Sequence, residues 1–227
     1  MFIGHFAMAF GAKKLAPEVS LGALFLACQL ADLIWPDLVL LGVERLAIEP
    51  GNTAMTPLSF EHYPYSHSLI ALFAWGVLCA AAYWIVSRAS LRIAIVIVLL
   101  ALSHWALDVL THRADMPITL SDSVRVGLGL WNVPALAIPL ELALLAAGVW
   151  VYARYTVARD RIGSTGLWAL VGFLVVVYAA NILGPPPPSV GAVAWSAQAM
   201  WLLVAWAYWV DRHRRPRSWA RLAHRFT

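Results

Sequence analysis

The residues of this chain with the clearest capacity for chemistry lie between Ser103 and Arg113, at the end of a long apolar run. His104, Asp108 and His112 are spaced four residues apart, so on a helix they lie along one face. An imidazole and a carboxylate at this spacing can hold one metal ion together. Ionisable groups are costly in a membrane-embedded helix, so their presence there indicates a function. The alternative interpretation is a polar stripe facing neighbouring helices, with His104 hydrogen-bonded to Asp108.

The composition excludes a soluble globular protein. Of the 227 residues, 62% are hydrophobic and 12% are charged, and the mean hydropathy is +0.74. These values are typical of a multi-pass membrane protein. Cys28 and Cys79 each lie in an apolar segment, so we expect neither a disulfide framework nor a cysteine-based metal site. The net charge of +4 gathers at the ends of the apolar segments, which does not indicate a nucleic-acid partner.

The apolar segments predict an all-α fold, a polytopic membrane helix bundle of about six transmembrane helices with a short additional helix at the N-terminus. Six segments are long enough to cross a bilayer of about 30 Å, namely 19–43, 65–86, 91–111, 128–151, 166–183 and 190–210. Residues 1–12 would be roughly 18 Å long as a helix, too short to cross, and we expect a re-entrant or interfacial helix there. Trp35-Pro36 is expected to bend or end the first span. The expected domains are therefore a single transmembrane domain, 1–211, and a basic amphipathic cytoplasmic tail, 212–227, on the membrane surface.

The distribution of basic residues predicts the orientation of the bundle. If Lys13 and Lys14 are cytoplasmic, thirteen of the 16 Lys and Arg residues fall on the cytoplasmic side, and Arg45, Arg113 and Arg125 fall on the other side. This is a strong positive-inside bias. Both termini are therefore expected to be cytoplasmic.

In this topology, acids and imidazoles from three spans meet near the outer face. The expected metal ligands are His67, His104 and Asp108, then Asp32, with His112 as an outer ligand and His5 if the N-terminal helix re-enters the bundle. Neutral imidazole and carboxylate together are a ligand set for zinc, our first choice of divalent cation, and carboxylate-rich sites extend to manganese or magnesium. His112 has the alternative role of an interfacial anchor.

Three further residues near the outer face are candidates for catalysis. Glu61 or Asp115 can accept a proton from a nucleophilic water, and Arg113 can hold an anionic headgroup. Asp115 continues the stripe of ligands if the helix lasts one more turn. The alternatives are a rim position for Glu61 and interfacial anchoring for Arg113. Deeper in the bilayer, Glu141 must face the bundle interior, and Gln198 is expected to hydrogen-bond between helices.

Several short motifs together resemble a known family. They are Gly4-His5, Asp32, Trp35-Pro36, His67-Ser68, Ser103-His104, Asp108 and His112-Arg113. Residues 1–115 with these motifs resemble the bacterial inner-membrane metal-dependent hydrolases, the LexA-regulated membrane hydrolase group. Two departures concern a second metal ion: Pro36-Asp37 is not followed by a second acid, and no His-Arg precedes His67.

The resemblance implies a metal-dependent hydrolase in the bacterial inner membrane. Because the expected site lies at membrane depth, we expect a lipid or a lipid-linked ester or phosphoester as the substrate, and membrane lipids as partners. A metal-ion or proton transporter or channel is an alternative, in which the same ligands form a transport site. A non-catalytic membrane scaffold is a second alternative, in which the polar groups only fix helix packing.

Overall fold

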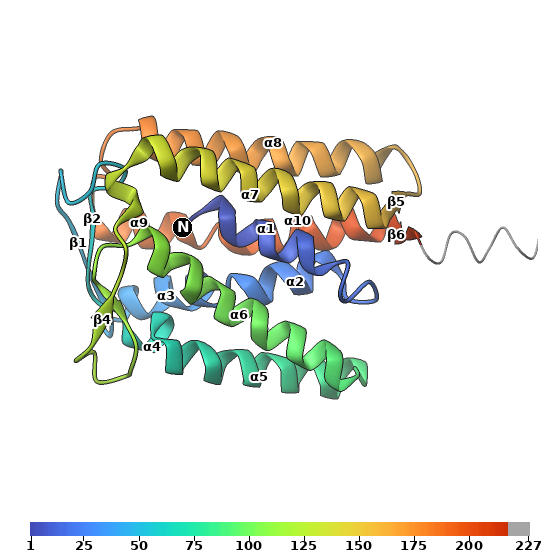
Figure 1. Ribbon diagram of the computed structural model, residues 1–227, viewed down its shortest axis with the longest axis horizontal. Coiled ribbons are helices and arrows are strands. Elements are labelled where there is room, and N and C mark those ends of the chain that lie inside the picture. The colour runs from blue at the N-terminus through green and yellow to red at the C-terminus, as the bar shows by residue number, and fades with distance from the viewer. Residues whose placement is uncertain (218–227) are drawn as a thin grey trace, which may run out of the picture.

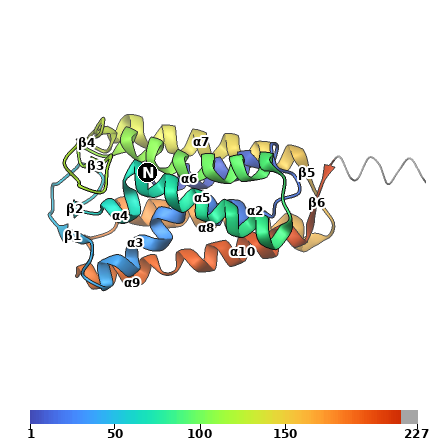
Figure 2. The ribbon, with the colours of Figure 1, turned by 90° about the horizontal axis from the view of Figure 1, so that it is seen from below.

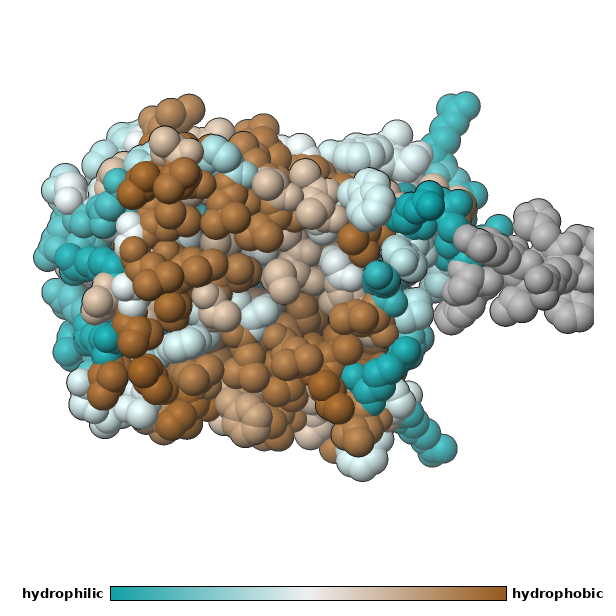
Figure 3. Space-filling view, in the orientation of Figure 1, coloured by the Kyte–Doolittle hydropathy of each residue, from teal (hydrophilic) through white to brown (hydrophobic). Residues whose placement is uncertain are grey.

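A computed structural model describes residues 1–217 and shows a bundle of helices that run along one common direction (Figure 1). Figure 3 shows, on the face in view, a broad belt of hydrophobic side chains across the middle of the bundle and hydrophilic ones at both ends. Large apolar side chains on this belt, such as Leu99, Val176 and Leu202, are 57%, 65% and 70% exposed. Such a belt is stable in hydrocarbon and not in water, so the chain is a multi-pass membrane protein.

Within residues 1–217, five helical segments are long and apolar enough to cross a membrane, and a bent helix pair adds a sixth. The straight ones are α5 (Leu69–Ser87), α6 (Leu91–Thr111), α7 (Pro134–Tyr155) and α8 (Arg161–Leu183), and the fifth joins α9 (Val190–Ala197) to α10 (Met200–Arg212). The predicted fold class, an all-α bundle of about six spans with a short N-terminal helix, is confirmed.

The first span is a broken helix. It consists of α2 (Leu21–Cys28) and α3 (Leu30–Leu40), which meet at an angle of 55°. The break falls at Gln29, whereas the sequence predicted it at Trp35-Pro36, and Pro36 instead lies inside α3. Pro36 removes one backbone donor from α3, and the helix continues past it. The backbone dihedral angles of Gln29 are not helical, so the helix breaks there. The pair packs between α5 and α6 on one side and α9 and α10 on the other (Figure 2).

Helix α1 (Ile3–Ala12) lies inside the bundle, where it packs against α2, α6 and α7. The cytoplasmic location of both termini stays a prediction. Figure 1 shows the start of the chain inside the bundle, nearer the end with β1 and β2, where the amino group of Met1 contacts Asp108 of α6. This follows from the short length of α1, which rises from Lys13 only partway through the bundle. Gly148 of α7 permits the close approach, because a Cβ atom there would lie 2.3 Å from the backbone oxygen of Ala7.

Short antiparallel ladders close both ends of the bundle. At one end β1 (Arg45–Ile48) pairs with β2 (Leu58–His62), and β3 (Met116–Pro117) pairs with β4 (Arg125–Val126). The same end holds α4 (Pro64–His67) and a 3-10 helix, η1 (Leu130–Asn132). At the other end β5 (Thr156–Ala158) pairs with β6 (Arg214–Pro216). The ladders satisfy backbone groups where the chain leaves the helices.

The end that carries Lys13 is held by buried polar contacts. Nζ of Lys13 donates to Oδ2 of Asp211 at 2.7 Å, and the hydroxyl of Tyr152 donates to Oδ1 at 2.6 Å. Arg214, which is 8% exposed, bonds Thr156. Residues 214–216 of the predicted tail thus pair with β5 at this end of the bundle. The rest of the predicted tail, from residue 218 on, lies outside the described residues.

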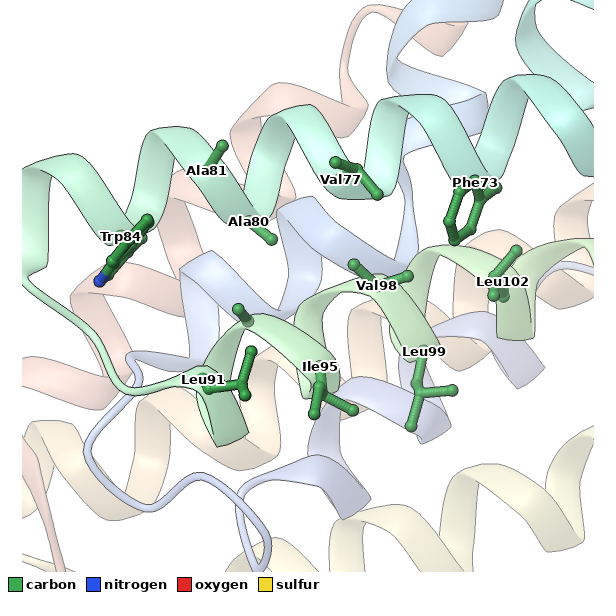
Figure 4. Close-up of a pocket in the computed structure, with 11 residues that line it drawn as sticks. Phe73, Val77, Ala80, Ala81, Trp84, Leu91, Ile95, Val98, Leu99 and Leu102 are labelled. Atoms are coloured by element: carbon green, nitrogen blue, oxygen red, sulfur yellow. The ribbon is translucent and has the colours of Figure 1, made fainter.

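Two apolar grooves lie on the surface of the belt. One runs between α5 and α6 and is lined by side chains such as Phe73, Val77 and Trp84 (Figure 4). The other lies among α1, α6 and α7, and Ser103 is among the residues that line it. In a bilayer, both grooves face hydrocarbon.

Candidate metal centre

Helix α6 supplies the central stripe of the site. His104 and Asp108 lie on successive turns of this helix, His112 is the first residue after it, and all three side chains are buried. Nε2 of His104 lies 3.2 Å from Oδ2 of Asp108, and Nε2 of His112 lies 3.9 Å from Oδ1 of the same residue. The four-residue spacing therefore brings the two imidazoles to opposite oxygens of one carboxylate.

Three other helices bring further ligand-type side chains to this stripe. His5 of α1 lies with its Nε2 3.1 Å from Oδ1 of Asp108. Asp32 of α3 lies with Oδ2 3.8 Å from Nε2 of His104 and with Oδ1 3.4 Å from Nε2 of His67, at the end of α4. The six predicted metal ligands are thus close to one another in the structure.

These separations fit a shared metal ion. Bonds of about 2.1 Å in a tetrahedral arrangement put neighbouring ligand atoms about 3.4 Å apart. Two groups of three have ligand atoms within 4.8 Å of one another: His5, His104 and Asp108, and Asp32, His67 and His104. Among residues 1–217, the buried Nε2 of His104 finds no hydrogen-bond partner, although it points at two carboxylates. A metal ion is the partner that this donor set fits.

The histidines are oriented by bonds on their other ring nitrogens. Nδ1 of His104 donates to the backbone oxygen of Cys28 at 2.8 Å. Because a carbonyl oxygen can only accept, Nε2 of His104 keeps its lone pair and faces the carboxylates. Nδ1 of His112 lies 2.9 Å from Oδ1 of Asp115, and Nδ1 of His67 lies 2.7 Å from Oγ of Ser66. Such partners fix ring orientation and raise the basicity of a ligating imidazole.

Behind His67, the structure reveals a residue that the sequence did not point to. Glu44, 1% exposed, accepts the hydroxyl of Ser66 at 2.6 Å, and its other oxygen accepts the backbone N–H groups of Tyr65 and Ser66 at 2.8 Å each. A Glu44–Ser66–His67 chain therefore orients this imidazole. An acid 22 positions before Ser66, in a segment predicted as a loop, gives no sequence signal for such a bond.

The predicted catalytic residues occupy different surroundings. Because α6 ends at Thr111, Asp115 lies in the following loop and not on the helix stripe. Its carboxylate is buried and accepts from Tyr63 at 3.1 Å as well as from His112. Burial and the charge of Asp115 raise the pKa of Tyr63, so this hydroxyl stays a donor.

The other two predicted catalytic residues lie toward the surface. Arg113 is half-exposed, and its Nε lies 3.4 Å from Oδ2 of Asp115. Its Nη2 donates to Oγ of Ser59 at 3.3 Å. Glu61 has an exposed side chain on β2, whereas the groups around Asp108 are buried. Their catalytic roles stay predictions.

Access to the buried cluster is uneven. The side chain of Asp32 is 25% exposed, whereas those of His5, His67, His104, Asp108 and His112 are at most 4% exposed. Asp32 stands on α3, beyond the break at Gln29. A molecule that reaches the cluster from outside therefore arrives on the side of Asp32.

Glu141 holds the start of α1 in place. Its Oε2 accepts the backbone N–H groups of Phe2 at 2.8 Å and Gly4 at 3.2 Å. These N–H groups lie at the start of the helix that carries His5 and have no partner within it, so the buried carboxylate satisfies them. The amino group of Met1 contacts Oδ1 of Asp108. Glu141 thus faces the interior, as expected.

Gln198 joins two helices. Its Nε2 donates to Oδ1 of Asp37 at 2.7 Å, which connects the α9–α10 junction to α3.

Comparisons of the chain with protein-family models, curated proteins and solved structures find no match. The family resemblance of residues 1–115 therefore stays a prediction, and the function is argued from the geometry of the site.

Proposed function

We propose that the protein is a membrane-embedded metal-dependent hydrolase that acts on a lipid or a lipid-linked ester or phosphoester. The observation that carries the proposal is the convergence of three imidazoles and two carboxylates from α1, α3, α4 and α6, in two overlapping groups with metal-ligand spacing. Bringing so many ionisable groups together away from water has a large cost, which a bound cation offsets.

The ligand chemistry favours zinc, with manganese or magnesium as alternatives. A divalent cation at such a site lowers the pKa of a water molecule and polarises an ester or phosphoester oxygen. Residues of the chain would hold this cation, since Nε2 of His67 and Nε2 of His104 both face Asp32. Ser66 and the backbone carbonyl of Cys28 fix the orientation of the two imidazole rings. A group of three protein ligands, such as Asp32, His67 and His104, would leave the fourth position of a tetrahedral ion for water or substrate.

The surrounding residues take supporting roles in this proposal. The partly exposed Asp32 marks the side from which substrate enters. Arg113, half-exposed beside the buried Asp115, holds an anionic headgroup. Asp115 orients His112, which makes it a positioning residue, and leaves Glu61 as the candidate proton acceptor.

Two features favour a lipid substrate. His104 lies seven residues before the end of α6 at Thr111, about 10 Å along the helix, which is membrane depth. The belt around this depth is apolar and carries grooves, one of them among α1, α6 and α7, on which acyl chains of the surrounding lipid can pack. A substrate with an apolar tail therefore meets the site more easily than a soluble one does.

The transporter alternative is disfavoured by the core beyond the cluster. Between His5 and the end at Lys13, α1 carries the buried rings of Phe6 and Phe10, which pack on Phe25 with centroids 4.9 and 5.1 Å away. A path for an ion needs polar groups or water along its length. The apolar packing closes this route.

The proposal assigns the end with β1–β4 to the periplasmic side of a bacterial inner membrane. Its support is the positive-inside bias, with Lys13 and Lys14 at the opposite end. Cysteines introduced at Ser121 and at Ser164, both exposed, are expected to react with an impermeant reagent from opposite sides of the membrane.

The function is tested on the purified protein in detergent or nanodiscs. Metal content is measured by elemental analysis, and hydrolysis is measured with phospholipid vesicles and with p-nitrophenyl esters and phosphodiesters. We expect bound metal and activity that chelation removes, and loss of both in His104→Ala. The matched control is His62→Ala, because His62 bonds Asp122 and is not among the ligand groups. A protein without bound metal, or a His104→Ala variant with full activity, would refute the proposal.

A further inference from the structure

The groove among α1, α6 and α7 follows the membrane-facing side of α1. Helix α1 packs against both α6 and α7 and is only ten residues long (Figure 1). The α1 side of the groove includes small residues, Ala7, Gly11 and Ala12. A Cβ atom added to Gly11 would meet nothing within 4 Å. The space beside Gly11 is therefore open.

The lining of this groove suits a hydrocarbon chain. Ser103 is the one lining residue with a polar side chain, and its hydroxyl is already bonded to the backbone oxygen of Leu100 at 2.7 Å. Along α6 the lining extends from Val96 to Ser103, which is about 10 Å. With a volume of about 440 Å³, the groove has a cross-section of about 40 Å², roughly half that of a helix about 10 Å in diameter. A hydrocarbon chain fits this space better than a helix of another chain does.

Cationic residues stand at the end of the groove that lies toward Lys13. On α6, Arg92 precedes the lining residue Val96 by one turn, so the two share a helix face. On α7, Arg154 follows Val151 by three residues and shares its face in the same way. Lys14 precedes the last lining residue of the α1 segment, and all three cations are exposed.

Two contacts fix the surroundings of these cations. Nζ of Lys14 lies 5.6 Å from the ring centroid of Tyr155, the neighbour of Arg154. Nη2 of Arg92 donates to Oε1 of Glu18 at 2.9 Å. Glu18 offsets one of the three positive charges, so the group keeps a net positive charge at the point where the groove leaves the apolar belt.

We propose that this groove binds an anionic phospholipid from the leaflet at the Lys13 end, with one acyl chain along α1 and the phosphate beside Lys14 and Arg154. Basic residues next to a cleft between membrane-spanning helices recognise anionic head groups. Their long side chains keep the charge at the membrane surface while the apolar stems cover hydrocarbon. The site does not depend on the metal-dependent function.

The bound lipid completes the packing of α1. This helix carries His5, and its side toward the groove includes Met8, which is 36% exposed. An acyl chain in the groove covers this side, so the lipid stabilises the position of α1 between α6 and α7. An anionic lipid is therefore expected to raise the Tm of the wild type, because it binds only the folded chain.

The test is lipid competition on the purified full chain in a neutral detergent. Phosphatidylglycerol and phosphatidylcholine with the same acyl chains are added in equal amounts, and native mass spectrometry counts the lipids that stay bound. Each cation near the bilayer surface favours an anionic lipid about fivefold, so we expect a preference for phosphatidylglycerol of about 20-fold. Lys14→Gln and Arg154→Gln are each expected to reduce it about fivefold. Arg161→Gln, an exposed cation at the start of α8, is the matched control and should change it less than twofold.

A second pair of variants fills the groove. Gly11→Leu is expected to abolish phosphatidylglycerol binding and its effect on Tm. Gly172→Leu is the matched control, because an added Cβ there also meets nothing within 4 Å, and it should bind lipid as the wild type does. Both variants replace glycine by a better helix former, so both are expected to fold. If Gly11→Leu loses its helical circular dichroism, Ala147→Leu, at an exposed lining residue, replaces it with the same expected result.

Three outcomes would overturn the proposal. Equal binding of the two lipids by the wild type means that the groove holds hydrocarbon without selecting a head group. Wild-type selectivity in the folded groove-filling variant means that the lipid binds elsewhere. A wild-type dimer that Gly11→Leu converts to a monomer means that a second copy of the chain occupies the groove. Each of these results leaves the proposed metal-dependent function intact.

Discussion

Removing the hydroxyl of Ser66 is expected to weaken metal binding without touching a ligand. This hydroxyl stands between Glu44 and His67, with oxygen–oxygen and oxygen–nitrogen distances of 2.6 and 2.7 Å. In Ser66→Ala, Nδ1 of His67 loses its partner, so the ring is less well oriented and less basic. Glu44 keeps its two backbone donors, Tyr65 and Ser66, so the turn itself is expected to persist.

The size of the effect follows from the bonds that are lost. Both distances are in the range of strong, charge-assisted hydrogen bonds, and Ser66 and Glu44 are 0% and 1% exposed, so water cannot replace the hydroxyl. Loss of such a partner of a ligating histidine reduces metal affinity about 10- to 100-fold. This corresponds to about 1.4–2.8 kcal/mol of binding free energy.

The assay is competition for Zn²⁺ or Co²⁺ between the purified protein and a chromophoric chelator, with circular dichroism as the measure of folding. Ser103→Ala is the matched control. Ser103 also precedes a candidate ligand, His104, but its hydroxyl donates to the backbone oxygen of Leu100. We expect a change of less than threefold in the control. If folded Ser66→Ala binds metal as tightly as the wild type, the orienting role of Glu44 and Ser66 is refuted.

Three further predictions concern stability. Chelation is expected to lower the Tm of this 227-residue chain by about 5–10 °C, since an ion present at 100 times its Kd adds about 2.7 kcal/mol to the stability of the folded state. An unchanged Tm would indicate a scaffold without bound metal. Gly148→Ala is expected to destabilise the fold by about 1–3 kcal/mol, because the added Cβ would meet the backbone of α1. Gly172→Ala is the control and should leave the stability unchanged, because a Cβ there would have nothing within 4 Å. Equal shifts in Tm for the two variants would contradict the close approach of α1 and α7. Lys13→Met removes the cation that faces the largely buried carboxylate of Asp211, so it is expected to lower the free energy of unfolding, measured with a chemical denaturant, by about 3 kcal/mol. Lys14 is exposed, and Lys14→Met is expected to lower it by less than about 0.5 kcal/mol.

The sequence predicted the membrane-spanning segments because hydropathy and length are local properties. It also predicted that His104 and Asp108 share a helix face, since the helical period fixes the relative positions of residues on one element. His112, predicted on the same face, follows the end of α6 and still lies near Asp108. Helix breaks were harder to predict. Pro36 is a known helix breaker, yet it lies inside α3, and the bend falls at Gln29, a residue type with no such local signal.

The composition and the spacing of polar residues determined by themselves that this is a helical membrane protein with ligand-type side chains near one end. Only the tertiary structure decided how those side chains meet. His5 reaches Asp108 across 103 positions because α1 is enclosed by the bundle, and Glu44 reaches Ser66 because β1 and β2 fold back over the helix ends. Local sequence patterns fix the faces of single helices, but the oxygen of Asp108 that each imidazole meets depends on packing between elements that are distant in the chain.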